Sequence, residues 1–319
     1  MTTTNFPGAM VEVSGLRKAY RRQVVLDGVD LRVPEATVFA LLGPNGAGKT
    51  TTVQILSTLI RADAGTVRVA GHDVTAEPDR VRAAIGVTGQ FSAVDALLTG
   101  AENLRLMTDL RHLGRVEGRR VVDDLLARFD LTEAAGKPVA AYSGGMKRRL
   151  DLAMTLVGRP RLIFLDEPTA GLDPRSRRAM WQIVRELVAE GATVFLTTQY
   201  LEEADHLADR VALLDGGRLV AEGSPAELKR LVPGGHVRLH FTDAAHLAAA
   251  AGLFPAATRH DDDLTLRVPG DGSVSGVRAL LDRLDAAGVA VDSLSLHTPD
   301  LDDVFLALTG HPTEEKVTA

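Results

Sequence analysis

The chain reads Gly43-Pro44-Asn45-Gly46-Ala47-Gly48-Lys49-Thr50 directly after the apolar run Val38-Phe39-Ala40-Leu41-Leu42. This order predicts a strand, a glycine-rich loop and a helix. Glycines permit backbone angles that a Cβ would obstruct, so successive N–H groups can point at an anion at the positive end of the helix. We therefore expect a phosphate cradle, because a turn that only joins a strand to a helix does not require the Gly-Lys-Thr ending.

Two side chains at the end of this loop carry the expected chemistry. Lys49 supplies a point charge for the outer phosphates of a nucleoside triphosphate. The hydroxyl of Thr50 is placed to ligate the Mg²⁺ that accompanies the triphosphate.

A second apolar run, Leu162-Ile163-Phe164-Leu165, ends in Asp166 and Glu167. If the run is a buried parallel strand, both carboxylates lie at the edge of the sheet that meets the nucleotide. Asp166 is then suited to hold Mg²⁺, directly or through water, and Glu167 to accept a proton from the attacking water. The alternative is an acidic pair that caps a helix.

A second helix N-terminus is expected at Tyr142-Ser143-Gly144-Gly145, which precedes an amphipathic segment over residues 146–154. Ser143 is the natural N-cap, and the first turn would offer free backbone donors. Taken alone, this pattern indicates only a capped helix. Its position a short way upstream of Asp166 favours a second anion-binding site.

Composition restricts the class of protein. The 319 residues are 45% hydrophobic and 24% charged with a formal net charge of -6, which argues against a dedicated nucleic-acid surface. The absence of cysteine excludes a disulfide scaffold and a cysteine nucleophile, and it fits a reducing cytoplasm. The first ten residues lack the pattern of a secretion signal, and no apolar stretch approaches the length of a bilayer span. We expect a soluble chain that does not cross a membrane by itself.

The expected organisation has two domains. Strand-like and helical segments alternate up to about Leu231, and Pro233-Gly234-Gly235 then marks a break. The later part reads as strands over 237–241, 264–268 and 289–296 and helices over 243–252, 277–287 and 301–308. It has no phosphate loop, so dimer contact, regulation and simple stabilisation all remain open for it. The predicted parts are a flexible N-terminus (1–10), an ATP-binding domain (11–231) with a helical lobe at about 95–155, a small α+β accessory domain (236–310) and a flexible C-terminus (311–319).

The order of motifs over residues 11–231 resembles the ATP-binding subunits of ABC transporters. The resemblance implies an α/β fold, namely a P-loop NTPase of ABC type with a mixed sheet core and a helical lobe. A narrower likeness, to the daunorubicin-resistance type of drug-export ATPase, also covers the small α+β C-terminal domain. The motifs that match the family are the phosphate loop, Gln90, Ser143-Gly144-Gly145, Leu165-Asp166-Glu167-Pro168, Gly171-Leu172-Asp173 and a polar residue after Val194-Phe195-Leu196-Thr197-Thr198. The narrower likeness rests on Tyr142 to Met146, Gln199-Tyr200-Leu201-Glu202-Glu203-Ala204-Asp205 and Leu301-Asp302-Asp303-Val304-Phe305.

The resemblance implies roles for these residues. Tyr20 would stack on adenine, the alternative being an ordinary strand aromatic, and Gln90 would touch Mg²⁺ or the attacking water, the alternative being a plain surface glutamine. Asp173 would communicate across a dimer interface, and it also fits the N-cap of a helix that begins at Pro174. The implied catalytic residues are Glu167, Lys49 and Gln199, and the implied metal-site residues are Thr50, Gln90 and Asp166. The implied ATP-binding residues are Tyr20, Gly43, Pro44, Asn45, Gly46, Ala47, Gly48, Lys49, Thr50, Thr51, Ser143, Gly144, Gly145 and Asp173, of which Ser143, Gly144 and Gly145 would bind the γ-phosphate held by a second subunit.

The chain departs from the family pattern at two positions. Gln199 stands where the family usually has histidine, and glutamine cannot take up a proton near neutral pH. Glu167 therefore carries the general-base assignment more heavily. Met146 replaces the glutamine that commonly follows Ser-Gly-Gly, which removes a polar contact.

The expected function is that of an ATP-hydrolysing subunit which uses ATP and Mg²⁺, pairs with a copy of itself around ATP, and lies peripherally on the cytoplasmic face of the membrane. It would power a separate membrane permease that exports a drug or antibiotic, with no nucleic-acid partner. One alternative is a regulatory ATP-binding switch with little turnover. Another is a soluble ABC protein of DNA repair or ribosomes, which would be expected to have a basic surface.

Overall fold

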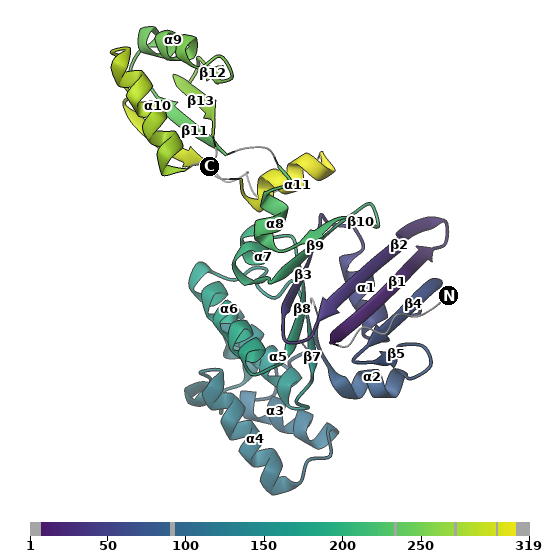
Figure 1. Cartoon of the computed structure of the whole chain (residues 1–319). Helices are drawn as coiled ribbons and strands as arrows, with labels where there is room; N and C mark the ends of the chain where they lie inside the picture. Colours follow the sequence, from purple (N-terminus) through teal and green to yellow (C-terminus); the bar gives the residue numbers. More distant parts are fainter. Residues whose placement is uncertain (1–7, 90–92, 233–234, 271–272, 298, 311–319) are drawn as a thin grey trace. The chain divides into compact units, whose positions relative to one another are not determined.

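The computed structural model describes residues 8–89, 93–232, 235–270, 273–297 and 299–310 (Figure 1). The chain divides into two compact units, Met1–Pro225 and Ala226–Ala319. Several predictions fall outside the described residues: the role of Gln90, the break at Pro233 and Gly234, the flexible C-terminus 311–319, and residues 1–7 of the flexible N-terminus.

A six-stranded mixed sheet forms the centre of the first unit, in the order β10-β9-β3-β8-β7-β6. Strand β3 pairs in parallel with β8 and β9, and β7 pairs in parallel with β6 and β8, whereas β10 is antiparallel to β9. Every residue of β3, β7 and β8 is buried, which explains why these strands read as continuous apolar runs. The strands are β3 (Val38–Leu42), β6 (Ile85–Thr88), β7 (Leu162–Asp166), β8 (Thr193–Thr198), β9 (Arg210–Asp215) and β10 (Arg218–Gly223).

Helices connect these parallel strands, and each helix follows from local signals in the sequence. In α6, the buried side chains include Met180, Val184 and Leu187, which lie on one face at helical spacing. Because parallel strands need crossover connections, β3, β7 and β8 all present their carboxyl ends at one edge of the sheet. The helices in this part are α1 (Lys49–Leu56), α2 (Pro78–Ala84), α6 (Pro174–Ala189) and α7 (Leu201–Leu207).

An antiparallel sheet, in the order β2-β1-β4-β5, completes the core of the first unit. Strand β1 begins at Ala9 rather than after the expected flexible segment, because Met10 is buried in the hydrophobic core. The strands are β1 (Ala9–Tyr20), β2 (Gln23–Pro34), β4 (Ala64–Val69) and β5 (His72–Asp73).

The region predicted to be a helical lobe is helical, with α3 and α4 lying together below the large sheet in Figure 1. A capping box fixes the start of α3, since Thr99 and Glu102 exchange side-chain and backbone hydrogen bonds. Helix α5 contacts both α3 and α4 and also contacts β6 and α6, so it links the lobe to the sheet. The elements are α3 (Gly100–Leu110), α4 (Arg115–Arg128), η1 (Thr132–Ala134), η2 (Val139–Ala141) and α5 (Gly144–Leu156).

The second unit contains an antiparallel sheet in the order β12-β13-β11-β14, with Leu239, Leu266 and Leu284 in its core. Three details differ from the sequence prediction. Helix α10 begins at Val274 rather than Val277, because Ser273 caps it by accepting the N–H of Gly276. Strand β14 begins at Ser293 rather than Val289, because Val289 packs in the core and its N–H bonds the carbonyl of Leu284. Strand β12 has three residues, too few to show alternation. The elements are α8 (Pro225–Lys229), which starts at the division, β11 (His236–His240), α9 (Ala244–Leu253), β12 (Thr258–His260), β13 (Thr265–Pro269), α10 (Val274–Ala286), β14 and α11 (Leu301–Thr309).

Three phenylalanines in register hold the parallel strands together. Phe195 on β8 faces Phe39 on β3 and Phe164 on β7, with ring centroids 5.4 Å and 5.5 Å apart. All three rings are completely buried.

We expect Phe195→Ala to lower the free energy of unfolding by about 3–5 kcal/mol, because the substitution leaves a cavity between both neighbouring rings. Urea unfolding of the full chain measures this loss. The matched change Val24→Ala, at a side chain that is 61% exposed, should alter stability by less than about 0.5 kcal/mol. Equal losses in the two variants would contradict this account of the core.

Candidate nucleotide-binding and hydrolysis site

The loop between β3 and α1 has a shape that only glycine accommodates. Gly46 and Gly48 have φ values of 80° and 108°, in the left-handed region. A Cβ on Gly48 would lie 2.7 Å from Cδ2 of Leu26, and a Cβ on Gly43 would lie 2.2 Å from the carbonyl oxygen of Leu214. The loop is therefore packed against β2 and β9 and keeps a fixed shape.

Helix α1 starts without a side-chain cap. Gly48 occupies the N-cap position and makes no side-chain hydrogen bond, whereas Ser143 and Asp173 cap α5 and α6. The first N–H groups of a helix have no partner within the helix, so those of α1 are available to an anion. The loop and helix together can hold a phosphate group.

Lys49 is folded back onto this loop. Its Nζ donates to the carbonyl oxygens of Gly43 at 2.7 Å and Pro44 at 3.1 Å, and the residue is only 6% exposed. Burial lowers the pKa of Lys49, and the nearby carboxylates of Glu167 and Asp166 oppose that shift. A phosphate group offers this ammonium stronger acceptors than the two carbonyls do.

Asp166 and Thr50 meet although 116 residues separate them. The Thr50 hydroxyl donates to Oδ2 of Asp166 at 3.2 Å, and the Thr197 hydroxyl donates to Oδ1. Hard oxygen donors beside a phosphate loop suit Mg²⁺, which usually takes one or two protein ligands together with water and phosphate oxygens. Thr50 and Asp166 could therefore hold this ion, as the sequence predicts.

Glu167 follows the last residue of β7 and has an unusual backbone conformation. Its φ is 48°, a left-handed value that costs a non-glycine residue roughly 1–2 kcal/mol. Its N–H donates to the carbonyl oxygen and the hydroxyl of Thr197, at 3.0 Å and 3.3 Å. This conformation places Glu167 in the lining of a cavity of about 350 Å³ that Lys49 and Thr50 also line. A base could thus act on water beside a bound phosphate.

The predicted second anion site does not belong to this cavity, which none of Ser143, Gly144 and Gly145 lines. Ser143 accepts the N–H of Met146 at 3.2 Å and caps α5 as predicted. Gly144 is exposed, and no atom lies within 4 Å of the position of a Cβ on it. The turn thus presents its backbone to solvent.

Asp173 lies close to this turn, because its hydrogen-bond partner Ser176 lies beside Gly145. Its carboxylate accepts the hydroxyl and the N–H of Ser176 and the N–H of Arg175, and these hydrogen bonds hold the pKa of Asp173 below its usual value. A Cβ on Gly145 would lie 2.6 Å from the Ser176 hydroxyl. The start of α6 and the start of α5 are therefore neighbours.

The remaining predicted residues are less closely tied to the cavity. Tyr20 ends β1 and is 46% exposed, so its ring is accessible, but Gln23 and Val25 line the cavity and Tyr20 does not. Gln199 directly follows β8 and is half-buried.

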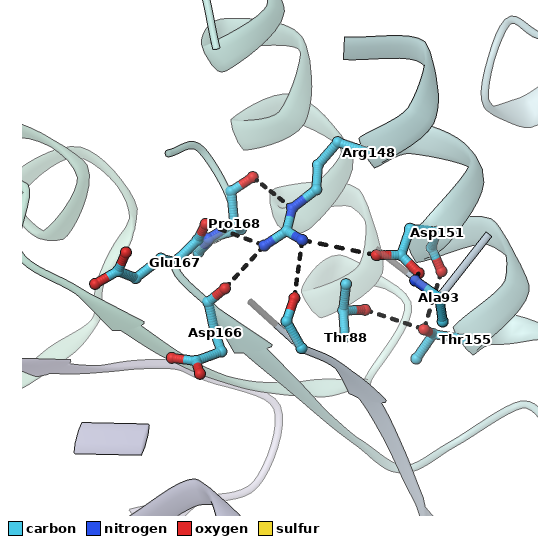
Figure 2. A network of polar contacts seen from close by, with 9 residues as sticks. Thr88, Ala93, Arg148, Asp151, Thr155, Asp166, Glu167 and Pro168 are labelled. Atoms are coloured by element: carbon cyan, nitrogen blue, oxygen red, sulfur yellow. Dashed lines mark hydrogen bonds and ion pairs between the residues drawn. The ribbon is translucent and has the colours of Figure 1, made fainter. Parts of the chain in front are cut away.

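Sequence reasoning missed two residues that organise the site. Thr197 lies inside an apolar run and gave no polar pattern, although it contacts both Asp166 and Glu167. Arg148 was expected only as one residue of an amphipathic segment, yet its side chain is 12% exposed and donates to the backbone of Asp166 and Glu167 (Figure 2). Neither contact has a signature in the spacing of the sequence.

Within the described part of the chain, none of the helices has the combination of length and hydropathy that a membrane span requires.

Comparisons with known proteins agree with this geometry. The family described as ABC transporter matches residues 26–170, and the ATP-binding protein DrrA1-3-like C-terminal domain matches residues 223–309. The chain is 49% identical to the daunorubicin/doxorubicin resistance ATP-binding protein DrrA of Streptomyces peucetius, over 98% of this chain and 96% of the relative. It is 45% identical to the doxorubicin resistance ATP-binding protein DrrA of Mycobacterium tuberculosis, over 95% of each chain.

Solved structures confirm the predicted fold class. An ATP-binding subunit of an ABC transporter superposes with a TM-score of 0.63 at 30% identity, over 70% of this chain and 92% of that structure. A dimeric ATP-binding cassette in a post-hydrolysis state with ADP and Pi gives a TM-score of 0.62 at 25% identity, over 67% and 98%. With its phosphate loop, its Asp166–Glu167 strand end and its near full-length relatives, the chain belongs to the ATP-binding proteins of ABC transporters.

Proposed function

We propose that this chain is the ATPase subunit of a drug exporter and that the described edge of the sheet is its hydrolytic site. The observation that carries the proposal is that Lys49, Thr50 and Glu167 line one cavity and that Asp166 is hydrogen-bonded to Thr50. Lys49 would neutralise the outer phosphates, and Thr50 and Asp166 would hold Mg²⁺, which stabilises the developing charge. Glu167 would accept the proton of the attacking water.

A second copy of the chain would complete each site. The exposed turn at Ser143, Gly144 and Gly145 offers backbone donors at a helix N-terminus, yet it lies outside the cavity of its own chain. Two copies in opposed orientation would let each turn bind the γ-phosphate held by the other loop. Loss of that phosphate on hydrolysis would remove contacts that favour the closed pair, so the population would shift to the open state.

The proposed partner is a separate membrane permease, which the chain would drive from the cytoplasmic face of the membrane. The cargo class comes from relatives, because those of Streptomyces peucetius and Mycobacterium tuberculosis are named for daunorubicin or doxorubicin resistance. In this proposal, residues 11–231 form the ATP-binding domain and residues 236–310 form an accessory domain. Tyr20 would stack on adenine, Asp173 would act across the dimer interface, and Gln90 would contact the metal or the water.

Glutamine at position 199 is compatible with ATP hydrolysis, so the proposal does not require a regulatory switch with little turnover. Glutamine can still hydrogen-bond the γ-phosphate, although it cannot store a proton as histidine can. Glu167 is the base, and the carboxylate that would bind the metal is in place, so turnover is expected.

Glu167→Gln should retain ATP binding and lower the hydrolysis rate by roughly 10²-fold or more, because the base is lost while the shape is kept. Lys49→Ala should instead lose most of its ATP affinity, since Lys49 is the only cationic side chain among the described residues that line the loop cavity. Calorimetry with Mg-ATP and a steady-state ATPase assay measure the two effects. Parental turnover in Glu167→Gln would refute the assignment of the base.

Gly144→Glu should abolish ATP-dependent dimerisation while the single chain keeps its fold, because the site of the Cβ is open in the protomer and the added carboxylate would repel phosphate. The measurement is light scattering with ATP in a Glu167→Gln background. The matched control is Gly252→Glu, also at a position with open space, which should dimerise normally. A dimer that forms equally well with Gly144→Glu would exclude this turn from the interface.

Deletion of the gene in its native host should increase sensitivity to daunorubicin or a related drug. Expression of the parent chain should restore resistance, and expression of Lys49→Ala should not, because the phosphate loop would be inactive. Growth inhibition across a drug series gives the result. Unchanged sensitivity to every anthracycline tested would remove the cargo class from the proposal and leave the ATPase assignment intact.

A further inference from the structure

Arg148 reaches the hydrolytic strand from the helix that begins with the Ser143 turn. It lies in the second turn of α5, and its side chain is 12% exposed. Its Nε donates to the carbonyl oxygen of Pro168 at 2.9 Å, and one terminal nitrogen donates to those of Asp166 at 2.8 Å and Glu167 at 3.0 Å. One guanidinium therefore binds three consecutive carbonyls.

Arg148 contacts the backbone of Asp166 and Glu167 rather than their carboxylates. Figure 2 shows the carboxylates of Asp166 and Glu167 pointing away from the guanidinium, while their carbonyl groups point toward it. The N–H of Glu167 is already held by Thr197. Both peptide groups of Glu167 are thus fixed, which stabilises its left-handed φ of 48° and so the direction of its side chain.

The other terminal nitrogen of Arg148 connects α5 to the chain after β6. It donates to the carbonyl oxygen of Gly89 at 3.0 Å and lies 3.6 Å from Oδ2 of Asp151. Asp151, one turn further along α5, accepts the N–H of Ala93 at 3.1 Å. The same face of α5 therefore holds both β7 and the two described residues that flank 90–92.

No other side chain type reproduces this arrangement. Burial lowers the pKa of Arg148, and the carboxylates of Asp151, Asp166, Glu203 and Glu167 oppose that shift, so the guanidinium stays charged. Arginine has five N–H donors in a planar fork, whereas the ammonium of lysine is a single point with three. Lysine would keep the charge but could not span Gly89, Asp166 and Pro168.

We propose that Arg148 is a positioning residue for hydrolysis, which sets the orientation of Glu167 and links it rigidly to the Ser143–Gly145 turn. The inference rests on the proposed role of Glu167 as the base. Because Arg148 and the turn belong to one helix, a phosphate bound at the start of α5 acts on the same rigid element that holds the carbonyl of Glu167. Binding of phosphate at the Ser143–Gly145 turn would thereby help to align the side chain of Glu167.

The test compares Arg148→Lys with Arg149→Lys in the full chain. Arg149 is the matched control, because it is adjacent on α5 but donates to the carbonyl of Phe129 at 2.9 Å and to Asp130. Arg148→Lys should lower kcat by about 10²-fold, the effect of misplacing a reacting group by about 1 Å. KM and the Kd for Mg-ATP should change less than about threefold, since the phosphate loop is untouched. Arg149→Lys should keep parental values.

A second variant covers the case in which Arg148→Lys is unstable. Arg148→Ala should regain part of its kcat when millimolar guanidinium chloride, far below denaturing levels, is added, and not with ammonium chloride at the same concentration. Parental kcat in Arg148→Lys would overturn the proposal. So would a loss of Mg-ATP binding equal to the loss of turnover, or guanidinium having no effect on Arg148→Ala. Parental turnover in Glu167→Gln would instead identify the failure as that of the base assignment.

Discussion

Parallel pairing of β3, β7 and β8 is the constraint on which the rest of the structure depends. It brings the ends of three strands, which are far apart in the sequence, to one edge of one sheet. The phosphate loop follows the first, the two acidic residues end and follow the second, and Thr197 lies near the end of the third. Contacts between the buried rings of Phe39, Phe164 and Phe195 join the same three strands. Binding and chemistry are therefore consequences of how the core is built.

The sequence revealed those parts of the site whose chemistry requires particular residues at short range. The glycine loop could be predicted because its backbone shape excludes a Cβ. Asp166 could be predicted because a carboxylate at the end of a buried apolar strand is unusual and points to a binding role. The helix starts at Ser143 and Asp173 were equally readable, since capping is local. These predictions depend on a few consecutive residues and not on the fold.

Long-range contacts could not be predicted in this way. Arg148 bonds to carbonyl groups, and every residue has a carbonyl, so its partners leave no trace in residue type. Strand β14 pairs with β11 from an earlier part of the chain, and Val289 packs in the core ahead of it, so tertiary contacts override the local pattern there. Strand β12 pairs with the neighbouring β13, and its three residues are too few to show alternation. Thr197 is polar in a run of apolar neighbours and reads simply as a β-branched strand residue. Only the folded chain distinguishes these residues from their neighbours.

The bonds from Lys49 to its own loop have a consequence for how the ammonium is placed. The carbonyl oxygens of Gly43 and Pro44 both accept from it, so the buried ammonium has hydrogen-bond partners within the loop. These bonds join the first turn of α1 to the residues that follow β3. The backbone of the loop therefore fixes the position of its own cation.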